Sequence, residues 1–306
     1  MFVRLNQALN CFRLDSASLA QSRFRVACSL DTFLFQQASI YIKRSFLTTT
    51  DSATEKKKME QQPPCDQWDG SVSQEDFMKK DECILVNDRD EIVGHSSKYQ
   101  AHRFVGEQPS GLLHRAFSVF LFDNDGRLLL QQRAASKITF PNVWTNTCCS
   151  HPLHGYDPTE VDGPEQVQDA SVPGAKRAAI RKLKHELGID SLSLRVEDFK
   201  FLTRLHYCAR DDVTWGPESE WGEHEMDYIL LCRASTIEMH PNTEEVQATK
   251  YVTLEELEDM MRPENGLLWS PWFRIIAERF LRVWWKDLDR ALSTDAHVDT
   301  QTIHSI

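Results

Sequence analysis

Residues 116–130 read AFSVFLFDNDGRLLL, and this stretch carries a clear fold signal. Residues 116–122 are an apolar run rich in strand-forming residues, and Asn124-Asp125-Gly126 is a turn sequence. Residues 128–130 are a second apolar run, so the stretch predicts two strands joined by a short turn.

Further strands and a helix are predicted on both sides of this hairpin. Residues 83–86 and 92–93 predict a second, short hairpin, and residues 226–232 predict a buried strand. Residues 175–187 predict a helix that ends at Gly188, because glycine readily adopts the left-handed conformation of a C-cap.

Two more helices are indicated near the end of the chain. Thr253 and Glu256 have the spacing of a capping box, which predicts a helix continuing to about residue 261. Ser270 and Pro271 stand where an N-cap and a first helical proline are favoured, so a last helix with a largely buried apolar face begins there. Strands and helices interleave without even alternation, which predicts a mixed α/β (α+β) fold with a partly antiparallel sheet.

Composition excludes several classes of protein. The chain has 306 residues and a formal net charge of -11, with 41% hydrophobic and 26% charged residues, as in an ordinary globular protein. An acidic chain lacks the broad positive field that non-specific nucleic-acid binding needs. No apolar stretch approaches the roughly 18 residues of a membrane span. The eight cysteines are scattered without a CxxC spacing, which predicts free thiols in a reducing compartment.

The N-terminal residues differ in composition from the rest. Residues 1–50 are basic and rich in serine, with Asp15 and Asp31 as their acidic residues, which is typical of a transit peptide for a mitochondrion or plastid. They can also be a disordered tail, and a start at Met59 would leave the protein in the cytosol. Residues 51–78 are interpreted as a linker, residues 79–290 as the folded domain, and residues 291–306 as a tail.

A thiol and an imidazole lie close together in Thr145-Asn146-Thr147-Cys148-Cys149-Ser150-His151-Pro152. A cysteine two residues before a histidine can be activated by it or can share a metal site with it. Buried structural roles for both residues remain open.

Paired carboxylates mark a second candidate site in Trp221-Gly222-Glu223-His224-Glu225. In a strand, Glu223 and Glu225 point to the same face, where two carboxylates need a cation, a shared proton or water. With His102, His114 and His151 they would suit a divalent metal, although spacing alone does not bring the five together. Nearby Lys98, Arg133 and Lys137 indicate an anionic substrate such as a phosphate, or else exposed loop charge.

The order of the motifs resembles the type 1 isopentenyl-diphosphate delta-isomerase family of the Nudix superfamily over about residues 80 to 290. It is carried by residues 114–122, 128–133, 137–141, 144–153, 221–225 and 270–273. The resemblance implies a Nudix-like mixed sheet flanked by helices, with additional N-terminal strands and a C-terminal helix. It also implies interconversion of isopentenyl and dimethylallyl diphosphates through a tertiary carbocation, in isoprenoid biosynthesis, with a small-molecule diphosphate as partner and a monomeric enzyme.

The resemblance implies a catalytic pair and its metal ions. Cys149 matches the catalytic thiol, rather than Cys148, because it precedes Ser150-His151-Pro152, and Glu225 matches the catalytic carboxylate. A divalent ion (Mg²⁺, Mn²⁺ or Zn²⁺) is expected at His102, His114, His151, Glu223 and Glu225. Glu186 matches a carboxylate near a second Mg²⁺ that bridges to the diphosphate.

The resemblance further implies a set of substrate contacts. Lys98, Arg133, Lys137 and Ser150 match positions that hold the diphosphate, and Tyr207 and Trp272 match aromatic residues of the hydrocarbon pocket.

The chain departs from its superfamily and from its family at two places. Lys182 and His185 stand where Nudix hydrolases usually carry metal-binding glutamates, which argues against pyrophosphate hydrolysis. Residues 215–220 partly repeat residues 221–225, as a short insertion or imperfect duplication. We place the site at the second copy because a strand follows it directly; use of the first copy would make Glu218 and Glu220 the carboxylates.

Overall fold

The structure is a computed structural model that describes residues 74–106, 110–235 and 237–306. The predicted transit segment and most of the predicted linker lie outside the described residues. The first described element, helix α1 (Gln74–Lys80), begins inside the range predicted as a linker. Within the described part, no helix is long and apolar enough to span a membrane.

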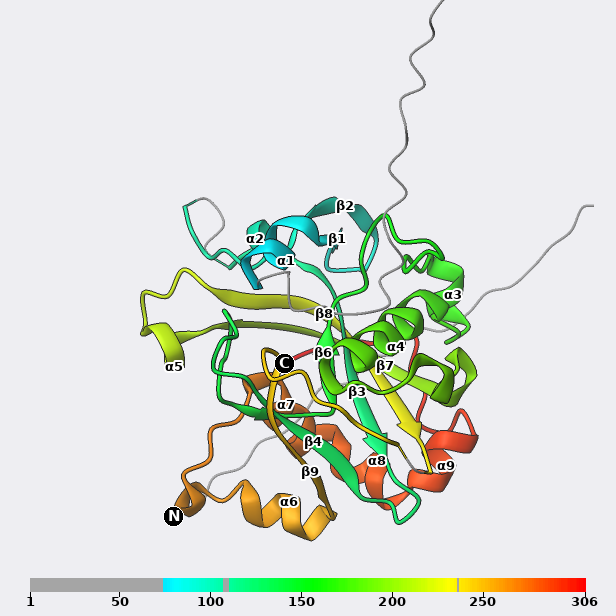
Figure 1. Ribbon diagram of the computed structural model, residues 1–306. Helices are drawn as coiled ribbons and strands as arrows, with labels where there is room; N and C mark the ends of the chain where they lie inside the picture. Colours follow the sequence, from blue (N-terminus) through cyan, green and yellow to red (C-terminus); the bar gives the residue numbers. More distant parts are fainter. Residues whose placement is uncertain (1–73, 107–109, 236) are drawn as a thin grey trace, which may run out of the picture. The chain divides into compact units, whose positions relative to one another are not determined.

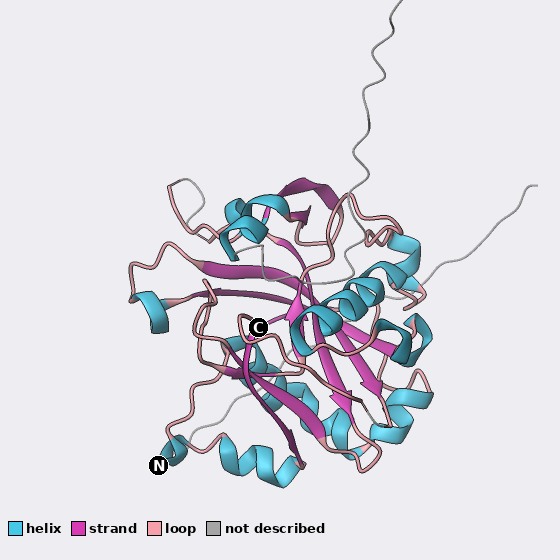
Figure 2. Ribbon diagram, in the orientation of Figure 1, coloured by secondary structure: helices cyan, strands magenta, loops and turns pink. Residues whose placement is uncertain are grey.

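A mixed sheet organises the described residues (Figure 2). Its main path runs in the order β10 (Ile303–Ser305), β7 (Phe199–Arg210), β8 (Gly222–Arg233), β3 (His114–Phe122), β1 (Glu82–Val86) and β2 (Ile92–Ser97). Strands β4 (Leu128–Arg133) and β6 (Cys148–Ser150) pair with β3, and β5 (Trp144–Thr145) and β9 (Val246–Val252) pair with β4. The β3–β8 and β10–β7 pairs are parallel and the others are antiparallel, which confirms the predicted mixed sheet.

Helices cover both faces of the sheet (Figure 1). Helix α4 (Pro173–Leu187) packs on one face, and the C-terminal helices pack on the other. The remaining helical elements are α2 (Lys98–Ala101), α3 (Pro164–Gln168), η1 (Ser191–Ser193), η2 (Val196–Asp198), α5 (Asp212–Trp215), α6 (Leu254–Met260), η3 (Pro263–Asn265), α7 (Pro271–Ile276), η4 (Ala277–Leu281), α8 (Arg282–Lys286) and α9 (Leu288–Ser293).

Strand β3 is buried over its whole length, as its apolar sequence predicts. Alternate side chains separate the two cores: Phe117 and Val119 face α4, whereas Phe120 and Phe122 face the C-terminal helices. The predicted hairpin is present, but β3 and β4 pair only at Phe122 and Leu128, beside the turn. The two strands therefore diverge away from the turn, and Arg133 at the far end of β4 lines a cavity.

Sequence signals at helix ends are confirmed in α4 and α6. Gly188 follows α4 with a φ of 65°, the left-handed conformation expected of a C-cap glycine. Thr253 accepts a hydrogen bond from the backbone N–H of Glu256, whose own side chain bonds back to Thr253, which completes the capping box.

The last helix differs from its prediction in two ways. Ser270 occupies the N-cap position, but its side chain makes no capping bond; its hydroxyl lies 2.8 Å from the hydroxyl of Thr145 instead. The helix start is therefore tied to β5, beside the site. A π-helical turn, η4, separates α7 from α8, and the aromatic residues Trp272, Phe273, Trp284 and Trp285 are buried as expected.

The segment interpreted as a C-terminal tail belongs to the fold. Helix α9 crosses the predicted boundary at residue 290, and β10 adds a parallel strand beside β7, with Ile303 opposite Arg204. The boundaries of the domain remain a prediction, but residues 303–305 complete one edge of the sheet.

Candidate active site

Strand register brings the two ends of the candidate site together. In the parallel β3–β8 pair His114 lies opposite Glu225, and in the antiparallel β7–β8 pair Tyr207 lies opposite Glu225. In the β3–β6 pair Ser118 lies opposite Cys149. Because opposite residues in a sheet share a face, the histidine, the carboxylate, the phenol and the thiol all lie on the face of the C-terminal helices.

Five predicted metal ligands converge. One ligand atom from each of His102, His114, His151, Glu223 and Glu225 lies within 4.8 Å of all the others. The three imidazole rings have centroids 4.7 to 4.9 Å apart. These residues come from the end of α2, from β3, from beyond β6 and from β8, so tertiary structure alone assembles the cluster.

Hydrogen bonding orients two of these histidines as ligands. The Nδ1 atoms of His102 and His114 lie 2.7 Å from the backbone carbonyls of Lys98 and Leu112, which makes them the N–H donors. Each Nε2 atom then directs a lone pair toward the cluster centre, as in metal-binding histidines held by carbonyl groups.

Among the described residues, three buried polar atoms at the cluster centre lack hydrogen-bond partners, whereas His151 Nε2 lies 2.9 Å from Oε1 of Glu225. The Nε2 of His102 lies 2.8 Å from Oε2 of Glu223, yet neither atom, nor Nε2 of His114, has a hydrogen bond within the described part of the chain. Buried polar groups are normally satisfied, so these atoms point to a shared partner at the centre. Three imidazoles and two carboxylates are a donor set that fits a divalent metal.

The two glutamates have pKa values shifted in opposite directions. Burial disfavours the charge of Glu223, but nearby His102 outweighs burial and lowers the pKa of that carboxyl. For Glu225, burial and the charge of Glu223 act together and raise the pKa well above its usual value. The pair thus separates into a carboxylate and a proton-holding acid, which is the condition for acid–base chemistry.

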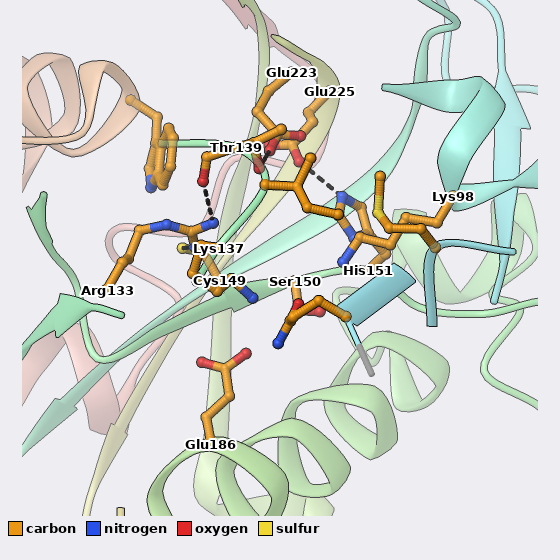
Figure 3. Close-up of a pocket in the computed structure, with 14 residues that line it drawn as sticks. Lys98, Arg133, Lys137, Thr139, Cys149, Ser150, His151, Glu186, Glu223 and Glu225 are labelled. Carbon is orange, nitrogen blue, oxygen red and sulfur yellow. Dashed lines mark hydrogen bonds and ion pairs between the residues drawn. The ribbon is translucent and has the colours of Figure 1, made fainter. Parts of the chain in front are cut away.

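A cavity with about 490 Å³ of unfilled space, part of it open to solvent, lies beside this cluster (Figure 3). Most of the predicted site residues line it: Lys98, Arg133, Lys137, Cys149, Ser150, His151, Glu186, Glu223, Glu225 and Trp272. His102 and His114 lie behind it in the metal-ligand cluster. Tyr207 is also outside the lining; it is buried, with its ring centroid 5.9 Å from that of Trp272.

The adjacent cysteines lie on opposite faces of β6. Cys148 is buried against α4, with its sulfur 3.4 Å from Oε2 of Glu186, whereas Cys149 faces the cavity. Burial raises the pKa of Cys149 to about 12, although the guanidinium of Arg133, with Nη1 4.0 Å from the sulfur, opposes the shift. The Cys149 thiol is therefore protonated at neutral pH. Both cysteines are free thiols, as predicted.

Cationic side chains lie around the cavity in fixed orientations. Arg133 is buried and donates from Nε to the carbonyl of Phe140 at 2.9 Å and from Nη2 to that of Thr139 at 2.8 Å. Lys137 Nζ lies 2.5 Å from Oε2 of the buried Glu245. These contacts hold two positive charges beside Cys149 and Ser150, as an anion site requires.

Glu186 lies on the cavity floor at the end of α4. It accepts a hydrogen bond from Gln131 at 3.1 Å and lies 3.2 Å from the ammonium of Lys182. Burial opposes its ionisation, but Lys182 outweighs it and lowers the pKa of the carboxyl. The ammonium of Lys182 thus supplies a positive charge beside the Glu186 carboxylate.

Trp272 forms one wall of the cavity. Its Nε1 donates to Oδ1 of Asn146 at 3.2 Å, and its ring meets that of Phe140 edge-to-face at 5.4 Å. These contacts fix the ring orientation. The same Asn146 accepts a hydrogen bond from Thr145, which links the wall to the start of the last helix.

The second copy of the duplicated motif forms the cluster, as predicted. Glu223 and Glu225 line the cavity, whereas Glu220 of the first copy pairs with Arg103 at 2.8 Å. The alternative that placed the carboxylates at Glu218 and Glu220 is wrong, because those side chains are exposed and outside the cluster.

Sequence reasoning missed several site residues. The hydroxyl of Thr139 donates to Oε1 of Glu223 at 2.7 Å. Thr139 lies within residues 137–141, which carry part of the family resemblance, but the sequence assigned it no role. Asp227 is buried two residues beyond Glu225, accepts a hydrogen bond from Ser118 at 2.8 Å, and has a pKa raised by burial to about 7. Its strand position was the available signal. Gln74 and Met78 of α1 line the cavity without any sequence signal.

Comparisons with known proteins agree with this geometry. The NUDIX domain family matches residues 112–273. Isopentenyl-diphosphate Delta-isomerase II, chloroplastic, from Arabidopsis thaliana is 44% identical over 234 residues, which cover 75% of this chain and 77% of the relative. The chain belongs to the isopentenyl-diphosphate delta-isomerase family. A member of this family from Gibberella zeae is 47% identical over 221 residues, covering 72% of this chain and 81% of the relative.

Proposed function

We propose that this chain interconverts isopentenyl and dimethylallyl diphosphates. The observation that carries the proposal is the cavity itself, which brings the thiol of Cys149, the carboxyl of Glu225 and a set of cations to the same space. A small diphosphate with a short hydrocarbon part matches this combination. The family membership supports the same substrate pair.

The reaction moves one double bond and leaves the atom count unchanged. A proton is added to the terminal methylene of isopentenyl diphosphate, which leaves a tertiary carbocation, and a proton is then lost from the neighbouring carbon. Cys149 and Glu225 are proposed as the two acid–base groups, one giving a proton and the other taking one. The reverse reaction exchanges their roles. The raised pKa of Cys149 keeps its thiol protonated at neutral pH, so a proton is present there to be given. The surroundings that raise the pKa of Glu225 also make its carboxylate a stronger base when it is ionised.

The carbocation needs electrostatic stabilisation without water. The face of Trp272 can supply about 2 kcal/mol or more when desolvated. Enzymes lower barriers by roughly 8 to 23 kcal/mol, so orientation and fixed charges must supply the rest. Burial of Tyr207 and Trp272 supports a site that excludes water around the hydrocarbon part of the substrate.

The cations and carboxylates divide into two proposed roles. Lys98, Arg133, Lys137 and Ser150 are proposed to bind the diphosphate, with Glu186 beside a Mg²⁺ that bridges to it. His102, His114, His151, Glu223 and Glu225 are proposed to hold Mg²⁺, Mn²⁺ or Zn²⁺. A divalent ion there would favour the ionised form of Glu225 by its charge.

Residues 1–50 are proposed as a transit peptide, which their basic, serine-rich composition supports. The relative from Arabidopsis thaliana is named as a chloroplastic protein, which supports the same proposal. Expression of residues 1–58 fused to a fluorescent protein tests the proposal: organelle fluorescence is expected, and diffuse cytosolic fluorescence would contradict it.

The enzyme is also proposed to act as a monomer. Its mass in solution, measured by sedimentation, tests this proposal.

The deciding experiment is incubation of the purified chain with isopentenyl diphosphate and Mg²⁺ in deuterated water, followed by NMR. We expect dimethylallyl diphosphate with deuterium incorporated in the methyl group. Glu225→Gln retains the shape of the side chain without its acid–base chemistry and is expected to abolish both signals.

Two rivals predict different outcomes. A Nudix hydrolase would release phosphate or pyrophosphate, and the replacement of hydrolase glutamates by Lys182 and His185 argues against it. A metal-binding regulatory domain would bind the ion and leave the isoprenoid unchanged. Either result in the NMR assay would overturn the proposed function.

A further inference from the structure

The insertion at the turn between β7 and β8 contacts the loop that lines the cavity. Helix α5 (Asp212–Trp215) leads into this insertion, which begins at Trp215, and Figure 1 shows α5 at the end of the β7–β8 hairpin. The contacted loop, residues 134–142, connects β4 to β5 and carries Lys137, Ile138 and Thr139 into the cavity wall.

The 134–142 loop orients two groups of the active site. Its carbonyls at Thr139 and Phe140 accept hydrogen bonds from Arg133, and so fix the plane of the guanidinium. Figure 3 shows Arg133 and Thr139 beside each other at the cavity. Its Thr139 hydroxyl donates to Glu223 at 2.7 Å. A shift of residues 139–140 would therefore move a diphosphate-binding cation and a metal-binding carboxylate together.

The conformation of this loop needs support from outside. Phe140 has a φ of 46°, a left-handed conformation that is unfavourable for a residue with a Cβ. Strained backbone persists where neighbouring groups hold it in place. At Phe140 that support comes from Asp211, whose Oδ2 accepts the backbone N–H of Phe140 at 2.8 Å.

The Asp211 carboxylate contacts two backbone segments at once. Its side chain is fully buried, and its second oxygen, Oδ1, accepts the backbone N–H of Thr214 at 3.0 Å. One carboxylate therefore caps α5 and anchors the 134–142 loop. Trp215, at the end of α5, adds a second link: its Nε1 donates to the carbonyl of Ile138 at 3.1 Å, although the residue is 55% exposed.

We propose that Asp211 and Trp215 are positioning residues, which hold residues 138–140 so that Arg133 and Glu223 are correctly oriented for the diphosphate substrate. Trp215 is the first residue of the inserted copy, so that copy contributes one of the two supporting contacts, and none of its carboxylates, which lie within the described part of the chain, belongs to the cluster of metal ligands. The expected effect on turnover rests on the proposed function. The effect on the anion site can be measured separately, by binding of inorganic pyrophosphate.

The test combines Trp215→Phe and Asp211→Asn in the full-length chain. Trp215→Phe keeps an aromatic ring and removes the N–H donor. We expect its KM for isopentenyl diphosphate and its Kd for inorganic pyrophosphate to rise by about 2- to 10-fold, the effect of one hydrogen bond. Asp211→Asn replaces one acceptor oxygen with an NH2 group, and kcat/KM is expected to fall by roughly 10- to 100-fold through misplacement of the site.

Val213→Ala is the matched control, because Val213 lies on the same short helix and is 64% exposed. Its KM, kcat and pyrophosphate affinity are expected to equal those of the unmodified chain. Thermal unfolding of every variant reports folding. If Trp215→Phe and Asp211→Asn change only the melting temperature and leave KM, kcat and the pyrophosphate Kd unchanged, the inference is wrong.

The two proposals can fail independently. If the unmodified chain isomerises isopentenyl diphosphate and the two variants match it, the proposed function is supported and the positioning role of Asp211 and Trp215 is wrong. If the unmodified chain does not isomerise this substrate, but pyrophosphate binding weakens in both variants and not in Val213→Ala, the proposed function is wrong and the positioning role is supported.

Discussion

Cys148 and Cys149 are adjacent in the chain, yet their side chains belong to different environments. Strand alternation directs Cys148 into the core under α4 and Cys149 into the cavity. At the residue scale, the direction of a single side chain therefore distinguishes a structural thiol from a catalytic candidate. The motif Ser150-His151-Pro152 was sufficient to select Cys149, but the reason for the choice is visible only in the strand.

Cys149→Ala is expected to lower kcat by about 10²- to 10⁴-fold or more, because it removes one of the two proposed acid–base groups. Cys148→Ala is expected to keep substantial activity and to lose some stability, since Cys148 is fully buried. Initial rates and thermal unfolding of both variants check this. A fully active Cys149→Ala enzyme would contradict the assignment of the thiol.

Alkylation should report the raised pKa of Cys149. With a pKa near 12, about one thiol in ten thousand is ionised at pH 8, and only the thiolate reacts. Because the pKa is raised, the rate of reaction with iodoacetamide should increase about tenfold per pH unit from pH 7 to 10 without levelling. Mass spectrometry of the Cys149 peptide measures this rate in the protein stripped of metal. A plateau near neutral pH would instead indicate a resting thiolate.

At the element scale, local signals located most helix ends and strands, but tertiary contacts changed some of them. The glycine at the end of α4 and the capping box of α6 formed as predicted. Ser270 satisfies the sequence pattern of an N-cap, yet its hydroxyl bonds to Thr145 because β5 lies within reach. The long strand β7 carried no recognised signal, and β10 was interpreted as a tail because short edge strands resemble loops in sequence.

Gly188 and Gly266 form a matched pair for measuring crowding at a left-handed position. Both have φ values near 60°, at 65° and 62°, but a Cβ on Gly188 would lie 2.4 Å from the carbonyl oxygen of His240. A Cβ on Gly266 would have no atom of the described residues within 4 Å. Gly266→Ala is expected to cost about 1 kcal/mol of unfolding free energy, and Gly188→Ala clearly more. Urea denaturation measures both, and equal losses would contradict the close approach.

At the scale of the whole molecule, the site is where separate parts of the chain meet. Its proposed metal ligands span residues 102 to 225, and the proposed positioning residues Asp211 and Trp215 add the turn between β7 and β8. Because β3 and β4 diverge, the sheet leaves space for substrate between the core that α4 covers and the core of the C-terminal helices.

Removal of the metal should therefore weaken the whole fold as well as the activity. An ion at His102, His114, His151, Glu223 and Glu225 would join four segments, and binding to the folded state alone adds about 2.7 kcal/mol when free ion is at 100 times its Kd. We expect a chelator to lower the melting temperature and abolish isomerisation, and added Mn²⁺, Zn²⁺ or Mg²⁺ to restore both. His102→Ala should remove the ion dependence of the melting temperature. Identical melting curves with and without chelator would argue against the site.

The sequence by itself determined the mixed α/β class, the central hairpin, the helix ends at Gly188 and Thr253, and the chemical identity of the site residues. These features depend on neighbours in the chain: alternation, turn residues and capping groups act over a few positions. Only the tertiary structure decided which groups meet. The convergence of His114 with Glu225, the opposite faces of Cys148 and Cys149, and the support of Phe140 by Asp211 all depend on strand register and on contacts between segments far apart in the sequence. Contacts between distant segments leave no local pattern in the sequence, because the same residues at the same spacing could equally well lie in exposed loops.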